Sequence, residues 1–240
     1  MKTRQFTQLL AAGVMAVTLG FGTAKAQDCE AYFPMKNGAS FELTHYNEKG
    51  KLENSTATTI VDESGNASAA IVKVHAVTRD AKGKDLASTD YTVACNNGEF
   101  HMDMRAMSMG QQQQSMQGVE GVTMEIDATD MVFPTGLAVG STLPDASMTM
   151  KATMNGMTIM NNTTKVTNRK VTAKESKTTP AGTFDCVVIE EDTEMHGAMG
   201  MNMTSHSKAW YSLGVGMVRQ EYYRNGKLGG YSELTKISGN

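Results

Sequence analysis

The sequence predicts an all-β protein built from a single antiparallel sheet, strongly curved, either open or closed into a partial barrel, with one short helical or loop insertion. Two observations carry this prediction. Short β-branched segments recur in which apolar and polar residues alternate, and glycine turn signals, four of them Asn-Gly, separate these segments. Glycine reaches the positive φ that tight hairpin turns need, and asparagine tolerates it. Turn signals at such short intervals are typical of an antiparallel meander.

The first 26 residues read as an export signal. They contain a basic start with Lys2 and Arg4, an apolar run over 9–22, and the small-residue cleavage site Ala24-Lys25-Ala26. We expect the mature protein, 27–240, to form one exported domain in the periplasm or cell envelope, or to be secreted. The run is shorter than the roughly 20 residues of a spanning helix, so we do not expect an integral membrane protein. Asp28 disfavours a lipid anchor on Cys29.

The charge balance argues against nucleic-acid binding. The full chain has 22 basic and 25 acidic side chains and a net charge of −3. Removing the leader takes away Lys2, Arg4 and Lys25 but no acid, which moves the net charge to −6. An acidic domain without a basic run is repelled by phosphate.

In chain order, the turn signals predict the strands between them. Lys-Gly-Lys turns at 49–51 and 82–84 precede an insertion over 104–118, which holds four consecutive glutamines and no β-branched residue. A hairpin then runs from 148–154 through Asn155-Gly156 into 157–168. The last hairpin pairs 217–223 with 228–237. Pairing through such turns is local, so these hairpins are the most direct predictions.

Three cysteines remain after export: Cys29, Cys95 and Cys186. In an oxidising compartment one disulfide and one free thiol are the default. We favour Cys29–Cys95, because both lie at the edges of strand-like segments. Cys186 alternates with Phe184 and Val188 and reads as a core position. The alternative is that all three are small buried apolar residues.

Five segments spread along the chain carry a family resemblance: CEAYFPMKNG at 29–38, FELTHY at 41–46, VGSTLPD at 139–145, TPAGTFDC at 179–186 and WYSLGVGMV at 210–218. Together they resemble an exported bacterial family of unknown function, the TapB-like group, which is related to a broader domain-of-unknown-function family. The resemblance implies an exported β-rich protein without an established reaction. It also implies a fold similar to the open, curved antiparallel sheets of lipoprotein carriers, and hence a concave apolar surface.

Methionine is the most unusual feature of the composition, with 20 in 240 residues. In a strand Met148 and Met150 point the same way. Flexible thioethers fill irregular space and line surfaces that accept varied partners. The methionine face is therefore either ordinary core or a binding face for an apolar ligand, such as a lipid, or for an envelope protein. We assign Met148, Met150, Met154 and Trp210 to that face.

A metal site is the alternative function. Thioethers favour Cu(I), and an exported protein resides where copper is handled. The segment 195–203 offers sulfur ligands and an imidazole for Cu(I) or Ag(I), from Met195, His196, Met199, Met201 and Met203. A structural or interaction module of the envelope is a third interpretation.

Catalytic patterns do not emerge from the sequence. The five histidines are widely spread and read as surface strand residues, without zinc-ligand spacing. The acids at 190–194 read as a solvated strand edge or loop. Neither a nucleophile elbow nor a phosphate loop is present. We therefore expect neither an enzyme nor a cofactor.

Overall fold

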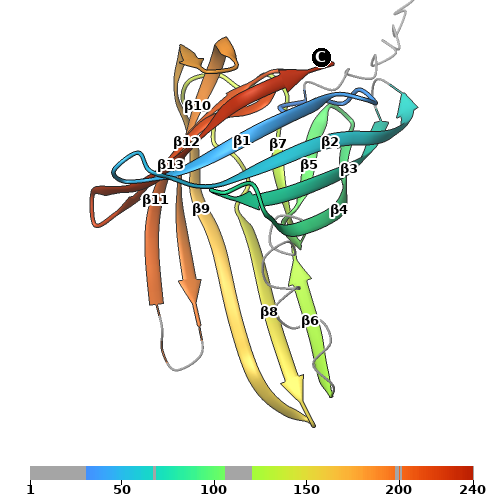
Figure 1. Ribbon diagram of the computed structural model, residues 1–240, viewed down its shortest axis with the longest axis vertical. Coiled ribbons are helices and arrows are strands. Elements are labelled where there is room, and N and C mark those ends of the chain that lie inside the picture. The colour runs from blue at the N-terminus through green and yellow to red at the C-terminus, as the bar shows by residue number, and fades with distance from the viewer. Residues whose placement is uncertain (1–30, 67–68, 106–120, 198–199, 201, 240) are drawn as a thin grey trace, which may run out of the picture.

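The computed structural model describes residues 31–66, 69–105, 121–197, 200 and 202–239. These residues form thirteen strands (Figure 1). The strands are β1 (Ser40–Asn47), β2 (Leu52–Asn66), β3 (Ala69–Asp80), β4 (Asp85–Asn96), β5 (Glu99–Asp103), β6 (Val122–Ala128), β7 (Asp130–Phe133), β8 (Ala146–Met154), β9 (Met157–Thr179), β10 (Gly182–His196), β11 (Asn202–Ser212), β12 (Gly216–Arg224) and β13 (Lys227–Ser238).

All thirteen strands belong to one antiparallel sheet, in the order β6-β8-β9-β10-β11-β12-β13-β1-β2-β3-β4-β5-β7. The two edge strands, β6 and β7, follow one another in the chain with only Thr129 between them. β6 pairs with β8, and β7 pairs with β5 at the other edge of the sheet. One stretch of chain therefore brings both edges together, and the sheet curls into a nearly closed barrel with an unsealed seam beside β7. The predicted fold class is confirmed.

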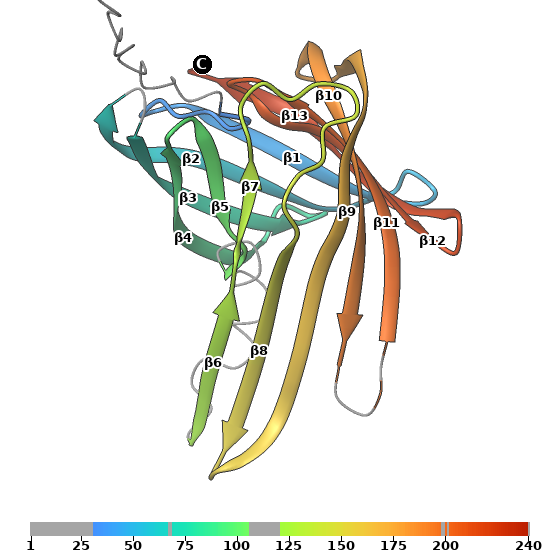
Figure 2. The ribbon, with the colours of Figure 1, turned by 180° about the vertical axis from the view of Figure 1, so that it is seen from behind.

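Part of the sheet continues past the barrel body. The strands β6 and β8, with the adjoining parts of β9, β10 and β11, project from one end of the barrel (Figures 1 and 2). We call this part the extension. Pairing continues along it, from Val122 opposite Met154 to His196 opposite Thr163. The extension is therefore a hydrogen-bonded sheet with two faces.

The predicted turns are confirmed where they join strands. Asn155 and Gly156 have φ of 51° and 79° and link β8 to β9. Asn225 and Gly226, with φ of 51° and 71°, link β12 to β13. Both residues of such a turn need positive φ, which explains the Asn-Gly pair. Most of the predicted insertion over 104–118 lies outside the described residues, as does the predicted leader.

An aromatic cluster fills the barrel at the end away from the extension. Phe33 stacks on Phe100 with centroids 5.8 Å apart, and Phe133 lies 5.5 Å from Phe100 and 5.1 Å from Tyr211. A second, smaller cluster forms on the outer side of the sheet from Cys186, Val188, Trp210 and Val218. Packing therefore closes one end of the barrel and adds a patch of core to its outside.

Candidate functional site

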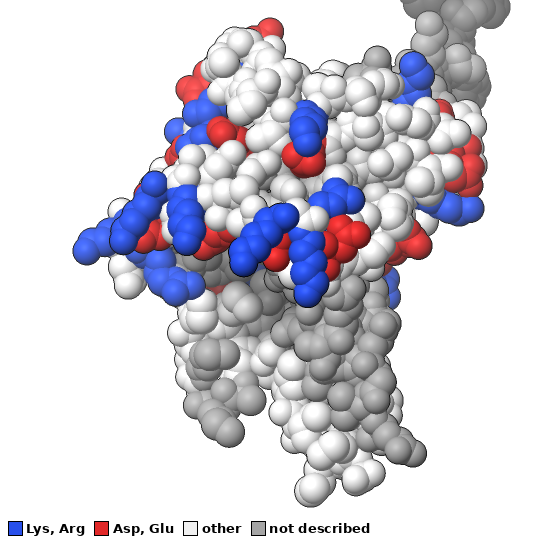
Figure 3. Space-filling model, viewed as in Figure 1, with Lys and Arg blue, Asp and Glu red and all other residues white. Residues whose placement is uncertain are grey.

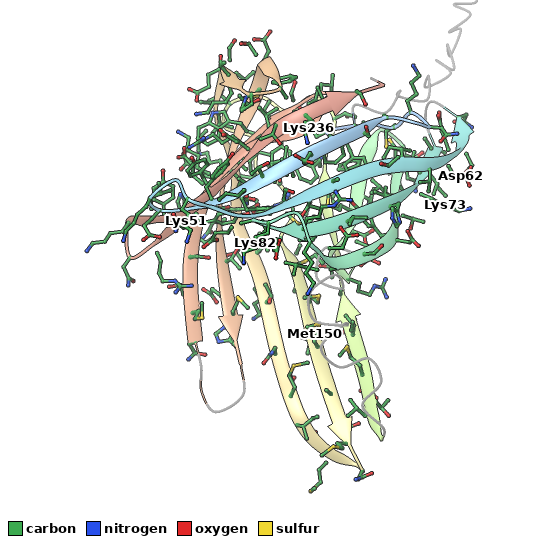
Figure 4. The ribbon with its side chains drawn as sticks, viewed as in Figure 1. Lys51, Asp62, Lys73, Lys82, Met150 and Lys236 are labelled. Atoms are coloured by element: carbon green, nitrogen blue, oxygen red, sulfur yellow. The ribbon has the colours of Figure 1, made fainter. Side chains whose placement is uncertain are left out.

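The inner face of the extension is lined with methionine. Directly paired residues of an antiparallel sheet share a face, so the register defines transverse rows. One row joins Met148 of β8 to Thr164 of β9, Met195 of β10 and Met203 of β11. The rows nearer the tip contain Ile126–Met150–Asn162, Met124–Ala152–Met160 and Val122–Met154–Met157. We call this surface the methionine face; Figure 4 shows its sulfur atoms along the extension.

The opposite face of the same strands is polar. The alternating positions of β8 are Ser147, Thr149, Lys151 and Thr153, and Thr149 exchanges a 3.0 Å hydrogen bond with Thr163 of β9. Side chains alternate between the faces of a strand. The methionines are therefore confined to one side of a two-sided sheet.

Exposure of the methionine face rises along β8 and β9 toward the tip, and also across the sheet toward β10 and β11. Met148 and Met150 are buried, with exposed fractions of 7% and 3%. Met154, Met160 and Met203 are half-buried, whereas Met195 is 44% and Met157 is 68% exposed. Large apolar side chains are thus accessible at the end of the extension.

Deeper in the barrel, the same face becomes polar. Tyr222 pairs with Ser207, which pairs with Glu191, so the three side chains share the inner face. The Tyr222 hydroxyl donates to Gln220 at 2.6 Å, Gln220 reaches Ser207 at 3.4 Å, and Ser207 reaches Glu191 at 3.4 Å. Burial raises the pKa of the Tyr222 hydroxyl, yet 39% of this residue is exposed. The inside of the barrel is therefore open to solvent at Tyr222.

This polar chain ends on Arg169, which is 1% exposed. Its Nε donates to Glu191 at 3.2 Å, and its Nη1 donates to the carbonyls of Val132 at 3.1 Å and Pro144 at 2.7 Å. Its guanidinium also lies 5.0 Å above the ring of Phe133. Arg169 therefore ties β9 to β7 across the seam.

The interpretation of the acidic run as solvated is wrong for Glu191, which is 8% exposed because it faces inward after Val187 and Ile189. The alternation of Val187, Ile189 and Glu191 in the sequence is the pattern that could have predicted the burial of Glu191. Among the histidines, His45 is half-buried, not a simple surface residue. It lies 2.6 Å from the hydroxyl of Ser232, and burial lowers its pKa, opposed by the charge of Glu53.

Trp210 is separated from the methionines with which it was grouped. It packs in the outer cluster, on the other side of the sheet from Met148 and Met150. Its Nε1 donates to Glu175 at 2.6 Å, and the Nζ of Lys177 lies 4.0 Å from its ring centroid. The β-bulge at this point places its extra residue, Val218, on β12, whereas β11 alternates regularly and turns Trp210 away from the face of Tyr211.

The predicted Cu(I) ligands are divided between two faces. Met195 and Met203 are directly paired on the inner face, whereas His196 points outward and its Nδ1 lies 2.8 Å from Oδ1 of Asn202. Met199 and Met201 lie outside the described residues. Among the described residues, no group of three or more His, Cys, Asp or Glu side chains is arranged to hold a metal.

The structure describes two of the three cysteines of the predicted mature protein. Cys186 is a free, buried thiol in the outer cluster, and burial raises its pKa to about 11. Cys95 is buried on β4, opposite Phe100. Its predicted partner, Cys29, lies outside the described residues, so the disulfide stays a prediction.

A hollow of about 580 Å³ lies on the outer face of β9 to β12. It is lined by polar side chains that bond to one another. The Nδ2 of Asn168 donates to Asp192 at 2.9 Å, and Nδ1 of His206 lies 2.9 Å from the same carboxylate. This hollow does not suit an apolar ligand, because its lining would lose water without gaining partners.

Comparison with known proteins identifies the family to which this chain belongs. The profile of the DUF3108-like family matches residues 36–234, from just before β1 to within β13. The chain belongs to the DUF3108-like family. The narrower resemblance to the TapB-like group stays a prediction. No curated protein sequence matches significantly.

Two solved structures share the fold of this DUF3108-like chain. A candidate lipoprotein from Parabacteroides distasonis is 24% identical with a TM-score of 0.72, and a candidate exported protein with YmcC-like fold from Bacteroides fragilis is 24% identical with a TM-score of 0.70. Each alignment covers 88% of this chain and 100% of the other. Within the described residues of the DUF3108-like chain, no helix has the length and apolarity to cross a membrane.

Proposed function

We propose that this chain is an exported, non-enzymatic protein of the cell envelope that holds an apolar ligand against the methionine face. The leader-like segment over 1–26 supports export, as do the descriptions of the two structural neighbours. An envelope protein presenting an apolar segment is the alternative occupant of the same face.

The one-sided gathering of methionine carries this proposal. A core that serves only folding needs no accessible side chains, yet Met157 is exposed at the tip, Met195 is exposed near the end of β10, and Met154 and Met160 are only half-buried. Exposed apolar patches on a folded protein mark interaction sites. Thioether side chains adapt to irregular partners, which suits a ligand with a flexible chain.

The position of the face also supports a ligand. The methionine face continues into the part of the barrel where Tyr222 is accessible, so a long apolar molecule bound along the extension would have room to reach the barrel mouth. The aromatic cluster around Phe133 closes the far end. A chain-like ligand would enter from the extension and stop at that cluster.

The first experiment is native mass spectrometry of the protein purified gently from the envelope of cells that express it. We expect a bound mass of lipid size. A hydrophobic fluorescent dye tests the same face directly, because its emission rises in an apolar site. The double variant Met154→Gln/Met160→Gln should weaken dye binding about tenfold per substitution, since each loses apolar contact area.

The matched control is Thr153→Gln/Asn161→Gln, which places the same new side chains on the same two strands but on the outer face. It should bind dye like the unmodified chain. Equal weakening in both double variants, with unchanged unfolding temperatures, would contradict the proposal. A bare mass together with no dye binding would also contradict it.

A further inference from the structure

We infer that the ligand of the methionine face is an anionic amphiphile, whose head group is held by cationic hairpin turns at the base of the extension. This inference rests on the proposed function and adds the class of ligand. It comes from the distribution of charge at one end of the barrel, which is independent of the methionines.

Three hairpin turns lie at the end of the barrel from which the extension projects. These turns join β1 to β2, β3 to β4 and β12 to β13, and the register places them at the same end, because Asn47 is opposite Gly230 and Asn54 is opposite Asp80. Each turn presents two exposed cations. The six are Lys49, Lys51, Lys82, Lys84, Arg224 and Lys227.

None of these six cations forms an ion pair within the described part of the chain. Some exposed lysines elsewhere are paired, as Lys73 is with Asp62 at 2.8 Å and Lys236 with Glu42 at 3.0 Å, and those without an ion pair among the described residues, such as Lys36, Lys170 and Lys174, do not lie at these turns. Unpaired cations at three separate turns of a chain with net charge −3 are a local excess that an anion would complement.

Four acidic residues lie close to these turns, and two of them already have hydrogen-bond or ion-pair partners. Asp80 accepts backbone N–H groups of Lys82 at 2.8 Å and Lys84 at 2.9 Å, and Asp85 pairs with Arg79 at 2.8 Å. Glu48 and Glu53 are exposed and flank the first turn. The six cations exceed these four acids by two, and the three further acids beside the third turn, Glu190, Asp192 and Glu194, line the outer hollow and not the methionine face.

The cations border the apolar surface. Figure 3 shows lysine and arginine side chains, with acidic side chains between them, across the lower edge of the barrel body, above an extension whose visible described surface carries no charged side chain. In Figure 4, Lys51 and Lys82 lie along that edge and Met150 lies below it on the extension. An apolar surface bordered on one side by cations is complementary to an apolar chain that ends in an anion.

The head group can be a carboxylate or a phosphate, because lysine binds both as a point charge. A neutral ligand would leave the cations unused, and a cationic one would be repelled. Probes that share a twelve-carbon chain separate these cases: laurate, dodecyl phosphate, dodecylphosphocholine and dodecyltrimethylammonium, each below its micelle concentration. Their affinities are measured by displacement of the hydrophobic dye.

We expect laurate or dodecyl phosphate, or both, to bind at least about tenfold more tightly than dodecylphosphocholine, and dodecyltrimethylammonium to bind weakest. The triple variant Lys49→Gln/Lys51→Gln/Lys82→Gln should weaken binding of the anionic probes about tenfold, because each exposed charge pair contributes a factor of roughly two to five. Binding of dodecylphosphocholine should not change. Salt should remove the anionic advantage.

The matched control is Lys36→Gln/Lys170→Gln/Lys174→Gln, which removes the same charge from exposed lysines away from these turns. It should bind all four probes like the unmodified chain. Equal affinity for all head groups would overturn the inference and leave the proposed function intact. Failure of every probe to displace dye or bind directly would overturn both. Equal losses in the two triple variants would overturn the cationic turns as the head-group site.

Discussion

The Nε atom of Arg169 lies 3.2 Å from Oε2 of Glu191, where the two side chains are 0% and 9% exposed. The same guanidinium holds the carbonyl of Val132 on β7, so this buried pair connects the sheet interior to the strand that closes the barrel. A buried charge without its partner is costly, because the protein interior solvates it poorly.

Arg169→Met should therefore lower the free energy of unfolding by about 3–5 kcal/mol, measured by urea denaturation. Arg79→Met is the control, because Arg79 and Asp85 form an exposed pair at 2.8 Å. That change should cost less than about 1 kcal/mol. Similar small losses in both variants would show that the buried pair does not hold the seam.

Trp210 is the only tryptophan, so its fluorescence reports on the outer cluster alone. It lies on the opposite side of the sheet from the methionine face. Binding of a non-fluorescent ligand such as laurate should leave the wavelength of its emission maximum unchanged, while displacing dye from the inner face. A shift of the emission maximum on binding would indicate that the ligand occupies the Trp210 side instead.

The Asp192 carboxyl, in the outer hollow, makes a pH-dependent contribution to the stability of the fold. Hydrogen bonds from His206 and Asn168 hold the pKa of this carboxyl below its ordinary value of 3.8. A depressed pKa stabilises the fold fully above that ordinary value, and this contribution is lost as pH falls through the folded-state pKa. His206→Ala should raise the pKa of Asp192 toward its ordinary value, as measured by carboxyl NMR titration. An unchanged titration would mean that Asn168 alone sets it.

The cysteines give a prediction for the oxidised protein. One thiol, Cys186, should react with Ellman's reagent, slowly in the folded state because it is buried and its pKa is raised to about 11, and rapidly after unfolding. The intact mass should be two hydrogens below the fully reduced value, for Cys29–Cys95. Three reactive thiols in the unfolded, unreduced protein would contradict the pairing.

The local part of this fold was predictable from the sequence. Two-residue Asn-Gly turns join strands that are neighbours in the chain. The hairpins that turn at Gly156 and Gly226 therefore do not depend on residues distant in the sequence. The grouping of Met148, Met150 and Met154 on one face follows from strand alternation in the same way.

The sequence shows that the unpaired cations are present, but it does not show that they lie at one end of the barrel. Lys51, Lys82 and Lys227 are far apart in the chain, and only the order of strands brings their turns to one end. The sequence alone therefore could not predict the proposed head-group site, since its position depends on pairing between β13 and β1.

By itself, then, the sequence determined the β class, the positions of the turns and the one-sided pattern of methionine, because each depends on residues close together in the chain. The tertiary structure decided that β6 and β7 join the two edges of the sheet, because barrel closure brings those edges together. The register across β8, β9, β10 and β11 decided that Trp210 and Met148 lie on opposite faces. A bulge decided that Arg169 faces inward, because β9 places Asn168 and Arg169 opposite the single residue Glu191, and one extra residue reverses the alternation along the rest of a strand.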